Sequence, residues 1–118
     1  MRDFRKYEVW QLSHSLVLEI YSQTVSFPKS EQYGITSQLN RASVSIPTNI
    51  SEGCGRSSDA EFHRFVQISL GSAHEVEYLL QLSFDLKFID STIYKSLDAK
   101  VNLVKQKLYH LAQKLNNK

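Results

Sequence analysis

The feature that most constrains the fold is the spacing of apolar residues near the end of the chain. An apolar side chain recurs every three or four positions, and the set comprises Ile93, Leu97, Val101, Val104, Leu108, Leu111 and Leu115. This spacing, close to a heptad repeat, puts all of them on one side of an α-helix. The sequence therefore predicts a helix over residues 91–116, with Asp90 and Ser91 as its capping residues.

Three earlier segments show the same spacing and predict three further helices. They cover residues 8–25, 31–53 and 59–86. No segment alternates between apolar and polar residues as a half-buried strand would. The pattern therefore predicts an all-α protein.

Particular residues indicate where these helices begin, bend and end. Pro28 disfavours continuation of the first helix, and Ser30 is expected to cap the second. Pro47 removes a backbone donor and should bend the second helix without ending it. Ser58 and Glu61 have the spacing of a capping box at the start of the third helix.

The connections between the predicted helices are short, and the 118 residues include only 4 glycines and 2 prolines. A turn-rich all-β fold needs more chain reversals than these residues supply. Short connections favour antiparallel packing of consecutive helices. We therefore expect a single domain over residues 1–118, folded as an antiparallel up-down four-helix bundle.

The predicted third helix has more apolar surface than a helix of such a bundle normally buries. One face contains Phe62, Val66 and Leu80, and a second apolar face lies beside it. We predict that the second face is an oligomer interface, comprising Ile68, Gly71, Ser72, Leu79, Leu82 and Leu86. The alternative is a central helix that is buried within a monomer.

Charge is unevenly distributed along the chain, although the formal net charge is only +2. Residues 1–6 and 90–118 are basic, and the segment between them is acidic. Basic surfaces attract phosphates. The predicted nucleic-acid contacts are Arg2, Arg5, Lys6, Lys100, Lys107 and Lys114, with Arg41, Arg56 and Arg64 as a second set. The alternative is that these are solvated side chains that keep the protein soluble.

A polar stripe follows one side of the second predicted helix and continues into the third. Its members are Arg41, Asn49, Glu52, Arg56, Glu61 and Arg64. An arginine side chain suits a carboxylate and a phosphate equally well. The stripe is therefore either a structural polar network or a site for an anion or a nucleic-acid backbone.

The sequence gives no sign of catalytic chemistry. The segment Gly53–Gly55 lacks the lysine of a phosphate-binding loop and is interpreted as a helix stop. His63 and His74 are too far apart on a helix to share a metal ion, and no third group would activate Cys54. We expect no enzymatic activity, no catalytic residue, no metal site and no cofactor.

The sequence indicates neither membrane insertion nor secretion. No apolar run approaches the roughly 20 residues that a membrane-spanning helix needs. The basic N-terminus is not followed by the apolar segment of a secretory signal. A single cysteine cannot form an internal disulfide, which favours a reducing compartment. We expect a cytoplasmic protein.

Several short motifs of this chain occur together in one known family. They are Val9-Trp10-Gln11, Phe27-Pro28, Tyr33-Gly34-Ile35-Thr36-Ser37-Gln38-Leu39, Arg41-Ala42, Ser45-Ile46-Pro47, Asn49-Ile50, Glu52-Gly53, Gly55-Arg56, Glu61-Phe62, Arg64-Phe65 and Leu70-Gly71-Ser72. From Phe4 to Leu115 the chain resembles the bacterial four-helix-bundle proteins encoded in intervening sequences of the large-subunit ribosomal RNA gene. It is also similar to the accessory variability determinant protein of diversity-generating retroelements.

The resemblance implies a four-helix bundle that assembles into a ring-like pentamer without enzymatic activity. The retroelement relative implies RNA and a reverse transcriptase as partners. We therefore hypothesise a ring-forming, non-enzymatic protein that binds nucleic acid, RNA rather than DNA, through basic surfaces. The alternative is a structural or adaptor protein whose ring docks a protein partner.

Overall fold

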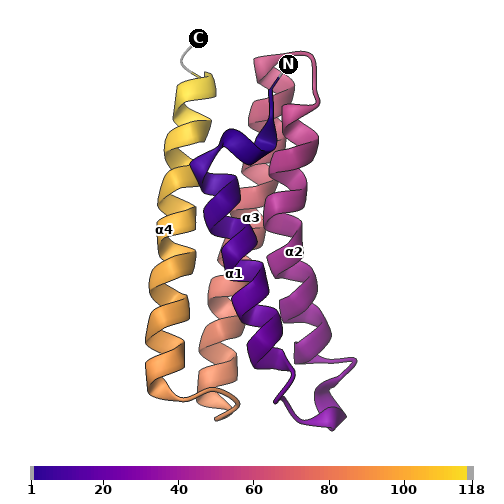
Figure 1. The fold of residues 1–118 in the computed structure, drawn as a ribbon, viewed down its shortest axis with the longest axis vertical. Helices are drawn as coiled ribbons and strands as arrows, with labels where there is room; N and C mark the ends of the chain where they lie inside the picture. The colour runs from indigo at the N-terminus through magenta and orange to yellow at the C-terminus, as the bar shows by residue number, and fades with distance from the viewer. Residues whose placement is uncertain (1, 117–118) are drawn as a thin grey trace.

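The computed structural model describes residues 2–116, which form four α-helices and no strand. The helices are α1 (Glu8–Thr24), α2 (Ile35–Cys54), α3 (Asp59–Asp85) and α4 (Ser91–Asn116). Short 3₁₀ turns at Phe4–Lys6 and Lys29–Glu31 precede α1 and α2. Consecutive helices are antiparallel, and the molecule measures 45 × 23 × 20 Å (Figure 1). Residues 1, 117 and 118 of the expected domain lie outside the described residues.

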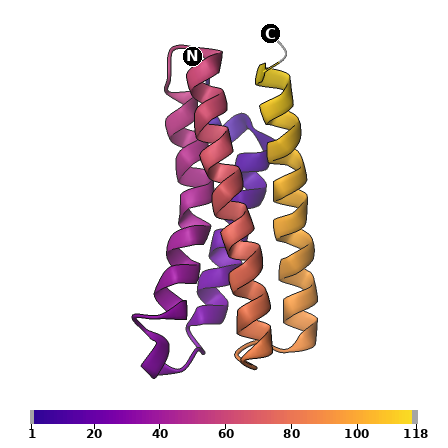
Figure 2. The ribbon, with the colours of Figure 1, turned by 180° about the vertical axis from the view of Figure 1, so that it is seen from behind.

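The four helices form an up-down bundle in which α1 and α3 lie on opposite sides. Both pack along α2 and α4. Figure 1 shows α1 in front, and the reverse view in Figure 2 shows α3 in front. Residues 2–7, the α2–α3 connection and the last turns of α4 lie together, and we call this the terminal end. The α1–α2 and α3–α4 connections form the opposite loop end.

Side-chain caps fix the starts of the two long helices. The hydroxyl of Ser58 accepts the backbone N–H of Glu61 at 3.1 Å, which is the predicted capping box at the start of α3. Asp90 Oδ1 accepts the backbone N–H of Ile93 at 2.8 Å at the start of α4. These local hydrogen bonds explain why α3 and α4 begin where the sequence pattern placed them.

The end of α3 depends on a residue in a left-handed conformation. Lys87 follows the helix with a φ of 67°. The N–H of Phe88 donates to the carbonyl of Ser83 at 2.8 Å, and that of Lys87 to the carbonyl of Phe84 at 2.9 Å. This pair of bonds is a Schellman motif, which usually places glycine at the left-handed position.

The second helix begins at Ile35 rather than at the predicted residue 31. Ser30 lies in the preceding 3₁₀ turn and does not cap α2. Gly34, with φ −108° and ψ −120°, separates the turn from the helix because its backbone is not helical. The helix then runs through Pro47 to Cys54.

The predicted helix stop at Gly53–Gly55 is confirmed, since α2 ends at Cys54 and Gly55 is its C-cap. Gly53 itself, however, is still helical. It lies inside α2, and no glycine among residues 2–116 has a positive φ. A β-carbon at Gly53 would lie 2.7 Å from Phe62 Cδ1 and 2.9 Å from Phe65 Cβ. Glycine is needed here because α2 and α3 approach each other closely.

The core follows the predicted apolar faces of all four helices. Its fully buried large side chains are Leu16, Ile20, Leu39, Ile46, Ile50, Phe62, Val66, Val76, Leu80, Val101, Val104 and Leu108. Three buried serines, Ser43, Ser69 and Ser83, donate to backbone carbonyls and so leave no hydroxyl proton unsatisfied. No helix within residues 2–116 is both long enough and apolar enough to span a membrane.

The predicted interface on α3 is partly buried within the bundle. Leu79 is only 4% exposed and belongs to the core. Ser72 is half-buried, and its hydroxyl lies 2.8 Å from that of Ser45 on α2. Leu79 is therefore covered within the subunit itself, because α2 and α4 cover both flanks of α3, which a helical wheel of α3 alone does not show.

Two separate apolar surfaces remain exposed on opposite sides of the bundle. On α3, an outer face comprises Ile68, Gly71, Tyr78, Leu82 and Leu86, and we call it the α3 strip. The other surface lies in the groove between α1 and α4. It comprises Leu12, Leu18 and Leu103, and we call it the α1 strip. Leu18 is 59% exposed and Ile68 is 43% exposed.

Candidate functional site

The terminal end collects basic residues that are far apart in the sequence. Arg5 and Lys6 precede α1, Arg56 lies between α2 and α3, Arg64 lies near the start of α3, and Lys114 lies near the end of α4. All five side chains are exposed. Because both chain ends and the α2–α3 connection meet at this end (Figure 1), these residues share one region, and we call them the basic set.

Most carboxylates of the terminal end already have partners, which leaves the basic set with excess positive charge. Asp59 pairs with Arg2 and Glu8 with Lys107, both at 2.6 Å. Glu61 accepts the hydroxyl of Ser57 at 3.3 Å, beside the Ser58 cap. Glu52 and Glu61 are the exceptions, since neither has an ion pair within residues 2–116, and their two negative charges offset only part of the five positive charges of the basic set.

Arg2 is a structural residue rather than a free phosphate ligand. Its guanidinium donates to the carbonyl of Arg56 at 2.7 Å and to Asp59 Oδ1 at 2.6 Å. It also lies over the ring of Phe62, 4.7 Å from the centroid. The side chain is only 22% exposed. Arg2 therefore ties the N-terminal segment to the α2–α3 connection.

Aromatic rings support two arginines of the basic set. Arg5 lies over the ring of Phe4 at 4.5 Å, and Arg56 lies over the ring of Phe65 at 4.7 Å. A guanidinium that stacks on a ring still presents its N–H groups at its edge. Arg5 has only a distant carboxylate, Asp3, at 3.8 Å. Both arginines are therefore oriented while their donors remain available.

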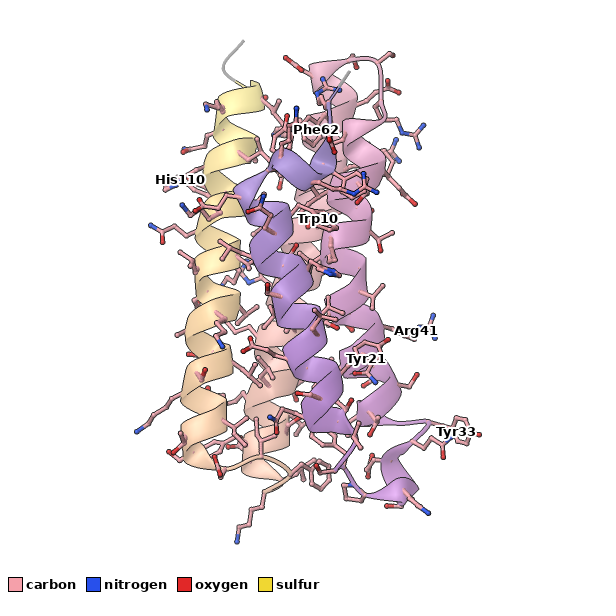
Figure 3. All side chains as sticks on the ribbon, in the orientation of Figure 1. Trp10, Tyr21, Tyr33, Arg41, Phe62 and His110 are labelled. Atoms are coloured by element: carbon pink, nitrogen blue, oxygen red, sulfur yellow. The ribbon has the colours of Figure 1, made fainter. Side chains whose placement is uncertain are left out.

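Trp10 packs on the bundle. Its indole N–H donates to Ser51 Oγ of α2 at 3.1 Å. Its ring stacks on His14 with centroids 4.9 Å apart and contacts Phe4 at the same distance. Figure 3 shows Trp10 between α1 and α2. The indole therefore holds the N-terminal segment in place and is not a free stacking platform.

The predicted contacts Lys100, Lys107 and Lys114 lie seven residues apart along α4, and we call them the lysine ridge. The ridge is divided between two roles. Lys100 pairs with Glu19, and Lys107 pairs with Glu8 at 2.6 Å. Both partners are on α1, so these ion pairs join α1 to α4. Lys114 has no ion pair within residues 2–116 and borders a hollow with Tyr7, Lys107 and His110. Only Lys114 of the ridge therefore remains in the basic set.

The predicted polar stripe does not form one network. Asn49 donates to the carbonyl and hydroxyl of Ser45, at 2.8 and 3.0 Å. Glu61 belongs to the cap of α3, and Arg56 stacks on Phe65. Among residues 2–116, the side chains of Arg41, Glu52 and Arg64 have no hydrogen-bond or ion-pair partner. The stripe therefore divides between the two alternatives that the sequence left open. Asn49 and Glu61 are structural, whereas the side chains of Arg41 and Arg64 are free to bind an anion.

A hollow between α2 and α3 was not recognised in the sequence. It has a volume of about 510 Å³ and is lined by Tyr33, Ser37, Gln38, Arg41, Ala42, Ser45, Ser72 and Glu75. Only Arg41 was a predicted contact for an anion. The signal that could have found the hollow is the i, i+4 spacing of Ser37, Arg41 and Ser45 along α2.

Cys54 lies beside the basic set but is not a reactive site. It is 3% exposed, and burial raises the pKa of its thiol. A protonated thiol is a poor nucleophile. Within residues 2–116, no three histidine, cysteine, aspartate or glutamate side chains converge as a metal site would require.

The chain is similar to proteins of one family. It matches the family described as 23S rRNA-intervening sequence protein over residues 5–110. A solved protein of unknown function from the S23 ribosomal protein family, from Bacteroides thetaiotaomicron VPI-5482, is 24% identical. The TM-score is 0.82, and the likeness covers 88% of this chain and 97% of that chain. At that identity it shows the fold alone. No curated protein matches the chain.

Proposed function

The chain belongs to the 23S rRNA-intervening sequence protein family, and from this premise we propose that it binds RNA through the basic set. The observation that carries the proposal is that Arg5, Lys6, Arg56, Arg64 and Lys114 meet at one end of the bundle. Arginine and lysine bind phosphate oxygens without regard to base sequence. The protein acts as a non-enzymatic binding module in the cytoplasm.

The proposal includes a ring of identical subunits, for which the two apolar strips supply a reason. A closed ring is built from a head-to-tail contact, in which two different surfaces of each subunit meet. The α1 strip and the α3 strip are different surfaces on opposite sides of one bundle. The family resemblance implies five subunits. A ring repeats the basic set in every subunit, so weak phosphate contacts add up.

The RNA-binding proposal is tested by charge reversal with a matched control. The test variant combines Lys6→Glu, Arg64→Glu and Lys114→Glu, and the control combines Lys29→Glu, Lys87→Glu and Lys95→Glu. All six side chains are exposed, and none has an ion pair within residues 2–116. The control residues lie toward the loop end. Lys100 and Lys107 are excluded because their substitution would also break the pairs that join α1 to α4.

The measurement is the affinity for a labelled single-stranded RNA as a function of salt concentration. We expect the wild-type affinity to fall steeply with salt, and the test variant to reduce the slope of log K against log salt by about 2. The control variant should keep most of the wild-type slope. Equal slopes for both variants would remove the terminal end as the RNA surface, and no shift of RNA at low salt would reject RNA binding.

The ring is tested by sedimentation and by mixing two variants. Wild type should sediment at several times the monomer mass of 13.6 kDa. Leu18→Glu disables the α1 strip and Ile68→Glu disables the α3 strip, so each variant alone should be a monomer. In a mixture, the intact α3 strip of one variant can bind the intact α1 strip of the other, giving a heterodimer. A folded wild-type monomer would contradict the ring.

The second candidate is an adaptor that docks a protein partner, such as a reverse transcriptase by analogy with the retroelement relative. The α1 strip favours it, because an exposed groove lined by leucines is suited to an apolar partner helix. The purified protein discriminates between the two candidates. An adaptor should be free of nucleic acid after purification and should not shift RNA at low salt. The leading proposal requires both co-purified nucleic acid and a shift of RNA.

A further inference from the structure

The hollow between α2 and α3 is separate from the basic set. Its residues come from the start of α2, the middle of α3 and the exposed turn before α2. Ala42 is buried at its base, and Ser45 and Ser72 face each other across it with their hydroxyls 2.8 Å apart. The side chains of α2 and α3 therefore form the walls of the hollow and are joined there by a hydrogen bond.

The hollow offers more hydrogen-bond donors than acceptors. Ser45 already accepts from Asn49 at 3.0 Å, and one hydroxyl proton joins Ser45 to Ser72. The other hydroxyl proton of the pair makes no hydrogen bond to a side chain that lines the hollow. The side chains of Ser37 and Gln38 have no hydrogen-bond partner within residues 2–116. With the guanidinium of Arg41, these groups favour a ligand rich in acceptor oxygens.

Arg41 and Tyr33 stand on the same side of the molecule. Figure 3 shows both side chains projecting from the α2 side, away from α4. Tyr33 is 90% exposed, and its ring takes no part in the packing of the bundle. Arg41 is exposed and has no carboxylate partner within residues 2–116. An exposed ring and a free guanidinium thus border one donor-rich hollow.

We propose that this hollow binds one nucleotide unit of a single RNA strand. The base stacks on Tyr33, because an aromatic ring provides a platform for any base. The guanidinium of Arg41 binds the phosphate through two parallel hydrogen bonds. The second hydroxyl proton of the Ser45–Ser72 pair and the side-chain amide of Gln38 donate to the other oxygen atoms of the nucleotide. The inference rests on the proposed RNA function. It adds a specific contact with one base and one phosphate to the general electrostatic attraction of the basic set.

Glu75 gives the proposal a second, independent consequence. Its carboxylate lines the same hollow and is not paired with Arg41. A carboxylate repels phosphate and weakens the effective charge of the arginine. Removing this charge by Glu75→Gln should therefore tighten RNA binding about threefold. If Arg41 had a purely structural role, neutralising Glu75 would leave RNA affinity unchanged.

The experiment measures the affinity for a labelled single-stranded RNA of about ten nucleotides, within the range that single-strand-binding domains cover. Tyr33→Ala should weaken binding about tenfold, whereas Tyr33→Phe, which keeps the ring, should stay within about twofold of wild type. Arg41→Ala should weaken binding about tenfold, and Arg41→Lys should restore only part of it because lysine cannot form two parallel bonds. Both residues are exposed, so circular dichroism and thermal unfolding should confirm unchanged folding.

The outcomes separate this inference from the proposal on which it rests. If Tyr33→Ala and Arg41→Ala bind as wild type while the basic-set variant is weakened, the hollow is not an RNA site and the proposed function stands. If the hollow variants are weakened and the basic-set variant is not, the hollow is the principal RNA site and the terminal end is not. If the wild-type protein binds no RNA, both are rejected.

Discussion

The two ends of the bundle are stabilised in different ways. At the terminal end, each local feature agrees with the fold: Gly53 allows close packing, and Arg2 satisfies a carbonyl and a carboxylate. At the loop end, Lys87 occupies a left-handed position. Thr36 Oγ1, in the first turn of α2, is buried without a hydrogen-bond partner among the described residues. Substitutions should therefore destabilise the terminal end, whereas some should stabilise the loop end.

The difference also bears on function. Side chains that bind phosphate do so best when the protein holds them in place, because ordering a mobile side chain costs binding energy. Two arginines of the basic set, Arg5 and Arg56, lie over aromatic rings on the end that Arg2 ties together. The loop end carries Tyr33 on the segment that precedes α2, and this side chain is 90% exposed. The two proposed RNA contacts therefore stand on supports of different rigidity.

The largest effect is expected for Gly53→Ala at the terminal end. The added methyl group would lie 2.7 Å from Phe62 Cδ1, on a ring that is fully buried. Overpacking of this kind should lower the free energy of unfolding by about 2 kcal/mol. Gly71→Ala is the matched control, since nothing lies within 4 Å of its added β-carbon. That control should stabilise α3 by about 0.5–1 kcal/mol in the same urea titrations, and equal losses for both would contradict the packing argument.

The next effect is expected for Arg2→Ala, which removes the tie between the N-terminal segment and the α2–α3 connection. Because the ion pair with Asp59 is partly exposed, we expect a loss of about 1 kcal/mol in unfolding free energy. Arg5→Ala provides the comparison, since its side chain is 70% exposed and its carboxylate lies 3.8 Å away. Chemical denaturation should show almost no change for Arg5→Ala. Equal effects would mean that Arg2 has no structural role beyond its charge.

The loop end should respond in the opposite direction. Lys87→Gly replaces a side chain that the left-handed backbone disfavours, at φ 67°. Since glycine adopts this conformation without a steric cost but loses more chain entropy, a net gain of about 0.5–1 kcal/mol is expected. Thermal unfolding measures it as a higher midpoint. Lys95→Gly, inside α4, should instead be destabilising by a similar amount. A loss at Lys87 would show that its side chain makes a needed contact.

The contrast between the ends shows how far the sequence determined the fold. Apolar periodicity was sufficient to locate all four helices, and the caps at Ser58 and Asp90 marked two of their starts. The same periodicity could not predict the surroundings of Leu79 or of Gly53. Their environments depend on how α2 and α4 approach α3, which no single helix encodes.

The candidate site was predictable in its residues but not in their grouping. Arg5, Lys6, Arg56, Arg64 and Lys114 were all identified as cations, and the up-down topology then brings them to one end. The ion pairs of Lys100 and Lys107 with α1 were missed because their partners lie near the other end of the sequence. The hollow at Tyr33 was missed for a similar reason, since its lining comes from two separate helices.

The smallest effect is expected in the middle of the bundle, where an ion pair between α3 and α4 can be compared with the Arg2 tie. Lys105 Nζ lies 2.7 Å from Glu77 Oε1, and this hydrogen bond lowers the pKa of Glu77 below its usual value. A carboxyl group whose pKa is lower in the folded state stabilises the fold at pH values above its unfolded pKa, about 4.3. That stabilisation is lost as the pH falls through the folded pKa.

Glu77→Gln should therefore reduce the unfolding free energy by about 0.5 kcal/mol near neutral pH. The difference from wild type should disappear in acid, below the folded pKa of Glu77. A His74→Asn background removes the imidazole that lies 3.9 Å from Glu77 Oε1, so that Lys105 is the remaining ion-pair partner of this carboxylate within residues 2–116. Urea titrations from neutral to acidic pH give the difference directly. A difference that persists in acid would assign the loss to packing of the side chain, and the Arg2 tie would then be the stronger electrostatic contact of the two.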